Sequence, residues 1–148
     1  MPAGVPVTSS DVAARVQTAT LTADSPGYST EVAIFTVTAF LEAGRRYAVQ
    51  GIARVSISAG TFPAAETALL RLREDSVAGT QLTLTQFPIL NTSANGFGSP
   101  PLYGEYTATV SGTKTFALTA QRNGGSATHT VRAATNAPAF LFVDLLRT

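Results

Sequence analysis

His129 is the only histidine in the chain, so any histidine-based catalysis would have to be built on it. Thr128 and Thr130 flank it in a segment of strand-forming residues, and no nucleophile elbow stands nearby. The chain has no cysteine, and one histidine leaves a zinc ion without enough ligands. We therefore interpret His129 as a solvated or interfacial side chain, and we expect no metal site and no cofactor.

Glu74 and Asp75 follow Arg73 and form the other candidate for chemistry, because paired carboxylates can bind calcium or act as acid and base. The spacing of a calcium loop is absent, and the next carboxylate along the chain is Glu105. A set of Arg–Glu salt bridges between the end of a strand and a loop is the better interpretation. The sequence predicts no enzyme and no catalytic residue.

The arginine pairs Arg45-Arg46 and Arg71 with Arg73 are the nearest approach to a basic patch. They lack interleaved aromatic residues, and the net charge is only +1, so the sequence predicts no nucleic-acid partner. The longest apolar run, residues 139–143, is far shorter than the ~20 residues of a membrane-spanning helix. We expect no membrane insertion.

The segments that must position these residues are predicted to be strands. About eight to ten short β-branched and aromatic segments alternate with turn signals at near-regular spacing, and no long helix is indicated. The sequence, 148 residues at 45% hydrophobic, predicts an all-β, two-sheet sandwich of jelly-roll type, with an up-and-down barrel as the alternative. We expect an extended arm over residues 1–10 and a single domain over residues 11–148.

Two segments carry more apolar residues than one buried face requires. Residues 31–58 are interpreted as a long β-hairpin whose arms face each other across Glu42 to Arg45, with Gly44 taking positive φ. In the first arm both alternating faces are apolar, and residues 139–146 repeat this pattern until Asp144, whereas the second arm has one polar face. Because a doubly apolar strand needs cover on both sides, we expect a homo-oligomer, the alternative cover being the long irregular stretch 88–102.

Four stretches together carry a family resemblance: Tyr47–Gly51, Leu70–Ser76, Gly112–Arg122 and Pro138–Leu145. In this order they resemble small virion proteins of tailed actinobacteriophages, which are similar in fold to the C1q/TNF-like jelly roll. The resemblance covers residues 15–146 and includes no active-site motif. It implies a trimer of ten-stranded jelly rolls whose inner sheets, including the C-terminal strand, pack around the threefold axis.

The resemblance leads to two functional hypotheses. The first is a capsid decoration protein, a homotrimer that is made in the bacterial host cytoplasm, sits on the phage head, contacts the major capsid protein and bridges capsomers. The second is a minor tail protein that binds the host surface or a glycan through its loops. The first is favoured because 148 residues leave no separate tail-attachment domain. The proposed contacts are an oligomer interface (Phe35, Val37, Phe140, Phe142, Val143, Leu145), a capsid-anchoring arm (Pro2, Val5, Pro6, Val7) and exposed loop residues (Asn95, Phe97, Leu102).

Overall fold

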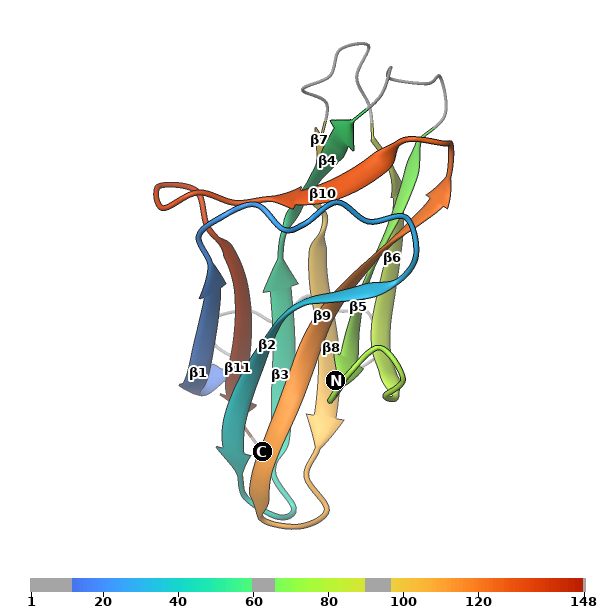
Figure 1. Cartoon of the computed structure of the whole chain (residues 1–148). Coiled ribbons are helices and arrows are strands. Elements are labelled where there is room, and N and C mark those ends of the chain that lie inside the picture. Colours follow the sequence, from blue (N-terminus) through green and yellow to red (C-terminus); the bar gives the residue numbers. More distant parts are fainter. Residues whose placement is uncertain (1–11, 60–65, 90–96, 148) are drawn as a thin grey trace.

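A computed structural model describes residues 12–59, 66–89 and 97–147 of the chain (Figure 1). The described residues form strands and connecting loops, and no helix among them is long and apolar enough to cross a bilayer. The strands are β1 (Val12–Leu21), β2 (Val32–Leu41), β3 (Arg46–Ile52), β4 (Arg54–Ala59), β5 (Thr67–Glu74), β6 (Gln81–Pro88), β7 (Phe97–Gly98), β8 (Pro101–Thr107), β9 (Gly112–Gly124), β10 (Thr128–Arg132) and β11 (Ala139–Leu146).

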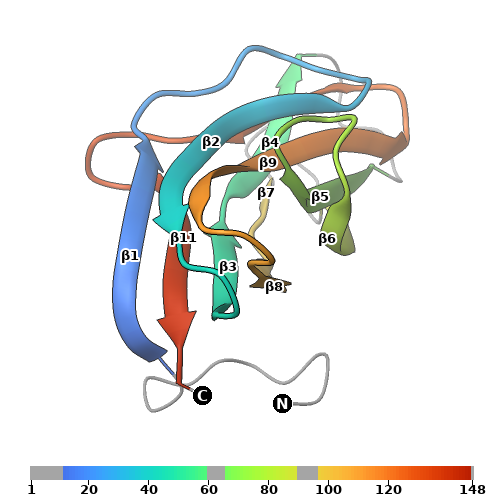
Figure 2. The same cartoon turned by 90° about the horizontal axis from the view of Figure 1, so that it is seen from below.

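Two four-stranded antiparallel sheets face each other, with the strand orders β1-β11-β3-β8 and β2-β9-β5-β6. Figure 2 shows them as two layers, seen from below. A third, three-stranded sheet of order β10-β4-β7 continues the structure at the upper end of Figure 1. The predicted all-β, two-sheet, jelly-roll-like sandwich is confirmed.

The hydrophobic core fills the space between the two four-stranded sheets. Inward side chains alternate along each strand, as a sandwich requires. Phe116, Leu118 and Leu72 contribute from the β2-β9-β5-β6 sheet, and Val49 and Leu141 face them from the β1-β11-β3-β8 sheet, all fully buried. The chain therefore has a single described core that needs no disulfide.

The predicted hairpin over residues 31–58 is wrong. The turn forms as expected, with Gly44 at φ 77° and the Arg45 N–H donating to the Glu42 carbonyl at 3.2 Å. However, β2 pairs with β9, whereas β3 pairs with β11 and β8. The two arms therefore lie in opposite sheets, and the turn crosses between the layers. The second arm is also divided at Ala53 into β3 and β4, which belong to different sheets.

The segment 66–88 contains the only hairpin between consecutive strands among the described residues, formed by β5 and β6. All other described sheet neighbours are distant in sequence, which is typical of a jelly roll built from Greek-key connections. The pairing of β11 with both β1 and β3 places the C-terminal strand inside its sheet.

Candidate functional site

His129 is fully buried, so its predicted exposure to solvent is wrong. Its Nε2 lies 2.6 Å from Oε2 of Glu66, which is also fully buried. The other carboxylate oxygen of Glu66 accepts the backbone N–H groups of Ser126 (2.7 Å) and Ala127 (2.9 Å). Burial alone would raise the pKa of Glu66, but the hydrogen bonds from Ala127, His129 and Ser126 outweigh it and hold the pKa below its ordinary value.

The Glu66 carboxylate has a structural role in this arrangement. It joins the start of β5 to the turn before β10, where Gly125 has a φ of 88°. A side chain at Gly125 would meet the carboxylate, because an added Cβ would lie 2.1 Å from Oε1. The Glu66–His129 pair thus connects the start of β5 with β10, and the ring of Tyr28 packs edge-on against His129 with the ring centroids 6.1 Å apart.

The remaining acidic residues of interest are also paired with cations. Lys114 Nζ lies 2.7 Å from Glu74 and 2.9 Å from Asp75, so salt bridges form at this strand end, but their cation is Lys114 and not the predicted arginine. Arg73 pairs with Glu31 instead. Across the described part of the chain, no three metal-binding side chains come together.

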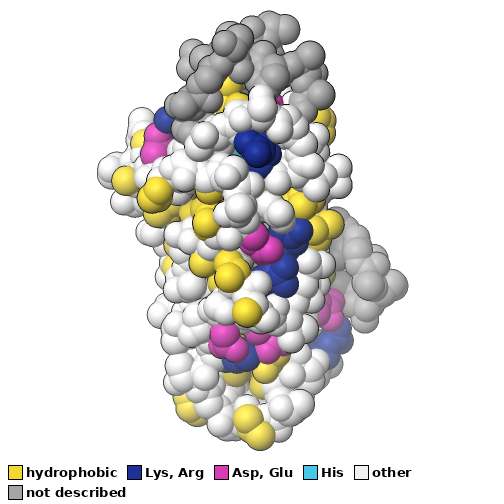
Figure 3. All heavy atoms as spheres, turned by 45° about the vertical axis from the view of Figure 1, so that its right-hand side comes forward, with side chains coloured by type: hydrophobic (Ala, Val, Ile, Leu, Met, Phe, Trp, Pro, Cys, Tyr) yellow, Lys and Arg dark blue, Asp and Glu magenta, His cyan; other side chains and the backbone are white. Residues whose placement is uncertain are grey.

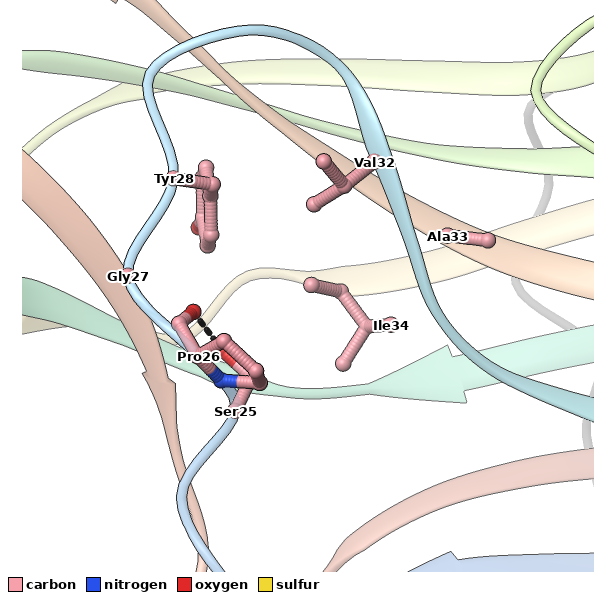
Figure 4. Close-up of a pocket in the computed structure, with 7 residues that line it drawn as sticks. All are labelled: Ser25, Pro26, Gly27, Tyr28, Val32, Ala33 and Ile34. Carbon is pink, nitrogen blue, oxygen red and sulfur yellow. Dashed lines mark hydrogen bonds between the residues drawn. The ribbon is translucent and has the colours of Figure 1, made fainter.

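A pocket of about 160 Å³ lies between the 25–28 loop and β2. Figure 4 shows that Tyr28, Val32 and Ile34 turn their side chains toward one another there, and that the Ser25 hydroxyl donates to the Pro26 carbonyl (2.9 Å). None of the residues that line it is charged. The hydroxyl groups among its described lining residues belong to Ser25 and Tyr28.

The surface with the greatest binding potential is the outward side of the β1-β11-β3-β8 sheet, which we call the aromatic face. Phe140 and Phe142 project outward from β11 and stack with ring centroids 5.4 Å apart and an interplanar angle of 16°. Phe140 pairs across the sheet with Ile52 of β3, whose side chain is 46% exposed. Rings and aliphatic side chains thus occupy positions where an isolated sandwich normally carries polar residues.

A buried carboxylate supports the aromatic face. Asp144 has no exposed surface, although it projects from the outward side of β11. Arg15 of β1 donates to both of its oxygens, through Nε at 2.6 Å and Nη2 at 3.2 Å, and Gln50 Nε2 donates at 2.8 Å. The Arg15 guanidinium also lies 3.9 Å from the centroid of the Phe142 ring. The charge of Asp144 is compensated within the chain, and Arg15 fixes the ring that it covers.

At the edge of the aromatic face, Glu105 of β8 forms an ion pair with Arg46 and accepts a hydrogen bond from the Tyr103 hydroxyl at 2.5 Å. Burial alone would raise the pKa of Glu105, but the hydrogen bonds from Tyr103 and Arg46 hold it below its ordinary value. The carboxylate is therefore ionised at neutral pH and forms a polar border to the aromatic surface.

The outward side of the β2-β9-β5-β6 sheet, which we call the polar face, differs in composition. Exposed Thr38 shares a hydrogen bond with Thr115 across β2 and β9, with their Oγ1 atoms 2.8 Å apart. Glu31 pairs with Arg73 through Nε at 2.7 Å and with Arg71 at 3.3 Å. Burial would raise the pKa of Glu31, but Arg73 and the Thr119 hydroxyl lower it below its ordinary value. In the view of Figure 3, acidic and basic side chains lie next to one another in mixed groups.

The predicted interface residues divide between the two sides of the sheets. Phe140 and Phe142 are half-buried on the aromatic face, and their place in an interface stays a prediction. Val37 and Val143 are buried in the core, so their prediction as interface residues is wrong. Phe35 and Leu145 are partly buried and pack against the core, and their place in an interface stays a prediction. A pattern with two apolar faces shows that a strand is buried, but it does not show which face meets the core.

The expected second layer over β2 is not supplied by the described part of the chain. Phe40 on its outward side is 63% exposed, and Thr36 and Thr38 are exposed beside it. A bulge between Ala33 and Phe35 shifts the pairing of β2 with β9, so alternation counted from Val32 does not continue through the strand. Only the second half of β2 has the inward and outward faces that the sequence predicts.

The predicted loop and arm contacts have different outcomes. Leu102 is 2% exposed and belongs to the core, so it is wrong as an exposed contact. Phe97 lies in β7, where it pairs with Ser56. Asn95 and the predicted anchoring arm (Pro2, Val5, Pro6, Val7) lie outside the described residues.

Two polar sites were missed from the sequence, although each left a signal. Asp144 is a single acid within an apolar strand. Because a buried charge requires a partner, this position indicates a nearby arginine. Glu66 stands directly before β5, and its side chain is buried. Its pairing with His129, 63 residues along the chain, could not be found without the fold.

No family model matches the chain, and no curated protein matches it. Among solved structures, a C-terminal domain of EclA described as a sugar-binding protein is 18% identical over 98% of this chain and 86% of that chain, with a TM-score of 0.38. A structure described as CBM4 is 14% identical over 93% and 81%, with a TM-score of 0.37. The VP2 subviral particle of infectious bursal disease virus is 15% identical over 93% of this chain but only 38% of VP2, with a TM-score of 0.39. The chain thus has a distant likeness, at the level of fold alone, to sugar-binding β-sandwich domains and to a viral jelly roll.

Proposed function

We propose that this chain is a non-enzymatic structural protein of a phage virion, a homotrimer that decorates the head and bridges capsomers. The observation that carries the proposal is the aromatic face. Two stacked, half-buried phenylalanines lie beside the exposed Ile52 on the outward side of one sheet, and apolar side chains gathered in this way favour association.

The strand order supports self-association by this face. In the C1q/TNF-like jelly rolls that the sequence resembles, the sheet with the C-terminal strand packs around the threefold axis. Here that strand is β11, and the outward side of its sheet is the aromatic face. The family resemblance and the apolar composition of this sheet therefore both favour the aromatic face as the contact surface.

The buried ion pair is compatible with closure of the aromatic face. Burying a charge is unfavourable unless it is paired and hydrogen-bonded. Asp144 already has Arg15 and Gln50 as partners within its own chain, so a neighbouring subunit need not supply one. A neighbour would cover the parts of Phe140 and Phe142 that still meet water. Because both rings are already half-buried, each would contribute less than a fully exposed side chain, for which the value is about 1.5–3 kcal/mol.

A pair of matched substitutions tests the interface. Phe142→Asp places a charge on the aromatic face, and Thr38→Asp places the same charge at an exposed position of the polar face. We expect light scattering to give a monomer for Phe142→Asp and an unchanged oligomer for Thr38→Asp. Oligomers from both variants, each folded by circular dichroism, would remove the aromatic face from the proposal.

Location on the particle tests the virion role. Purified labelled protein is added to phage heads and to whole particles that lack it, and its position and occupancy are measured by electron microscopy. We expect trimers on the head, no head binding by Phe142→Asp, and loss of binding but not of the trimer when residues 2–10 are deleted. Label confined to the tail tip would favour the alternative, a minor tail protein. Of the three loop contacts that this alternative named, Leu102 belongs to the core.

A further inference from the structure

An asparagine–glycine pair stands at the end of β9, next to the turn that leads to β10 at the upper right of Figure 1. Asn123 is exposed, and Gly124 is the last residue of β9. A backbone nitrogen can attack the side-chain amide of the asparagine that precedes it, and glycine has no side chain to hinder this approach. The pair therefore carries the residue types for a covalent modification that needs no enzyme.

The strand pairing leaves Asn123 outside the regular ladder. Two consecutive residues of β5, Thr67 and Ala68, pair with Gly124 and Arg122 of β9. Asn123 is thus the extra residue of a β-bulge, and it has no paired residue on β5. The pairing of β9 with β2, on the other side, ends before this point. Because a bulge disrupts the ladder locally, the backbone at Asn123 is held less firmly than the rest of β9.

Asn136 offers a comparison within the same chain. It is also exposed, but the residue that follows it is Ala137, whose backbone N–H donates to the Ala134 carbonyl at 3.0 Å. The methyl group of Ala137 and this hydrogen bond both oppose attack by its nitrogen on the side chain of Asn136. Exposure is common to the two asparagines, whereas the following glycine and the bulge belong to Asn123.

We propose that Asn123 converts spontaneously into a mixture of aspartate and isoaspartate. The Gly124 nitrogen gives up its proton and bonds to Cγ of Asn123, the Cγ–NH2 bond breaks, and the amino group leaves as ammonia with a proton in place of the bond. Water then opens the cyclic succinimide. Breaking the new N–Cγ bond gives aspartate, and breaking the bond between the nitrogen and the backbone carbonyl carbon gives isoaspartate. Water is the only co-reactant, and nothing is oxidised or reduced.

The position of Asn123 gives this modification a structural effect. The turn that follows holds the buried Glu66 carboxylate through the N–H groups of Ser126 (2.7 Å) and Ala127 (2.9 Å). Isoaspartate lengthens the backbone by one methylene group just before this turn. The added length should move both donors away from the carboxylate and leave it with His129 as its remaining recorded partner. We therefore expect the isoaspartyl form to unfold at a lower urea concentration than the fresh protein.

The test uses the full chain in whatever oligomeric state it adopts. The purified protein is incubated at neutral pH beside a capped Gln-Arg-Asn-Gly-Gly-Ser peptide, and both are followed by mass spectrometry and by labelling with isoaspartyl methyltransferase. We expect Asn123 to exchange its amino group for a hydroxyl at a rate within about tenfold of the peptide, because the bulge leaves it loosely held. Asn136 should stay intact. An unchanged Asn123 after the peptide has fully converted, or equal conversion at Asn136, would overturn the proposal.

A variant of the attacking residue tests the chemistry. Gly124→Ala should slow the conversion about tenfold, because a methyl group hinders the nitrogen. Among the described glycines, positive φ occurs at Gly44 and Gly125, so alanine at position 124 requires no left-handed backbone. Conversion at the wild-type rate in Gly124→Ala would contradict the succinimide route. If Gly124→Ala does not fold, the comparison of Asn123 with Asn136 in the wild type decides the question.

Two variants of Asn123 test the structural effect. Asn123→Gln should resist conversion and keep its urea midpoint on incubation, whereas the wild type should lose part of its own. Asn123→Asp carries the new charge on a backbone of normal length, so freshly prepared protein should unfold near the midpoint of fresh wild type. Incubated wild type that contains isoaspartate but is as stable as fresh protein would overturn the effect on the Glu66 contacts. An equal loss of stability in fresh Asn123→Asp would assign the effect to charge and contradict the role of backbone length.

Discussion

The aromatic face and the polar face are the outward sides of two similar four-stranded sheets, yet they satisfy different requirements. On the polar face, the exposed Thr38 is hydrogen-bonded to its cross-strand neighbour, and the charges of Glu31, Arg71 and Arg73 are mutually paired. On the aromatic face, stacked rings flank a carboxylate that is withdrawn from water. The comparison separates a face whose charges are paired with one another and which also exposes Phe40 from a face whose half-buried rings surround a buried carboxylate.

The ion pairs sharpen this contrast. On the aromatic face, Asp144 is 0% exposed while Arg15 is 49% exposed, so the acid depends on its partners for solvation. On the polar face, the side chains of Glu31, Arg71 and Arg73 all retain some access to water. Removal of the cation should therefore have unequal consequences on the two faces.

The largest expected effect is that of Arg15→Met, which leaves Asp144 buried with Gln50 as its remaining side-chain partner. We expect a loss of about 3 kcal/mol in the free energy of unfolding, because an unpaired buried charge is unfavourable. The matched change on the polar face, Arg73→Met, leaves Glu31 with Arg71 and Thr119 and should remove about 1 kcal/mol. Urea denaturation measures both, and equal losses would refute the contrast between the faces.

Acidic pH should reduce the stability that the ionised carboxylates on both faces give to the fold. The pKa values of Glu31 on the polar face and Glu105 on the aromatic face are lowered in the folded chain, as is that of buried Glu66. A group with a lowered folded-state pKa stabilises the fold fully above its unfolded pKa of about 4.5, and this stabilisation is lost as the pH falls through the folded value. We expect the urea concentration at half-unfolding to decrease as the pH falls below about 4.5. The decrease should be less steep in Glu66→Gln. A midpoint that stays constant as the pH falls further would contradict these pKa directions.

The smallest expected effect concerns the hydrogen bond between Thr38 and Thr115 on the polar face. A double-mutant cycle with valine at both positions should give a coupling free energy of about 0.5 kcal/mol, as for exposed cross-strand threonine pairs. We expect no change in oligomeric mass for any variant in the cycle. Dissociation of the oligomer by these substitutions would show that the polar face, too, contacts a partner.

The fold class was predictable because the β-branched segments and their turn signals are local features of the sequence. The pairing of β2 and β3 was not. A turn with Gly44 at positive φ is compatible both with a hairpin and with a crossing between two sheets, and only the partners β9 and β11, far along the chain, decide between them. Non-local pairing of this kind is invisible to periodicity.

The candidate site was predictable in part for a related reason. The two apolar sides of β11 led to Phe140 and Phe142 on its outward side, but the same reasoning also selected Val143, which is fully buried in the core. The distinction rests on which side of β11 meets the opposite sheet. Single-sequence alternation defines two faces but assigns neither of them to the interior.

The central claim is that the aromatic face associates with further copies of the chain. The most direct test is the mass of the purified protein by sedimentation equilibrium over a wide range of concentration. The account predicts three times the 15.3 kDa of one chain, with conversion to a single-chain mass in Phe142→Asp. A wild-type protein that remains a stable monomer at every concentration would contradict it.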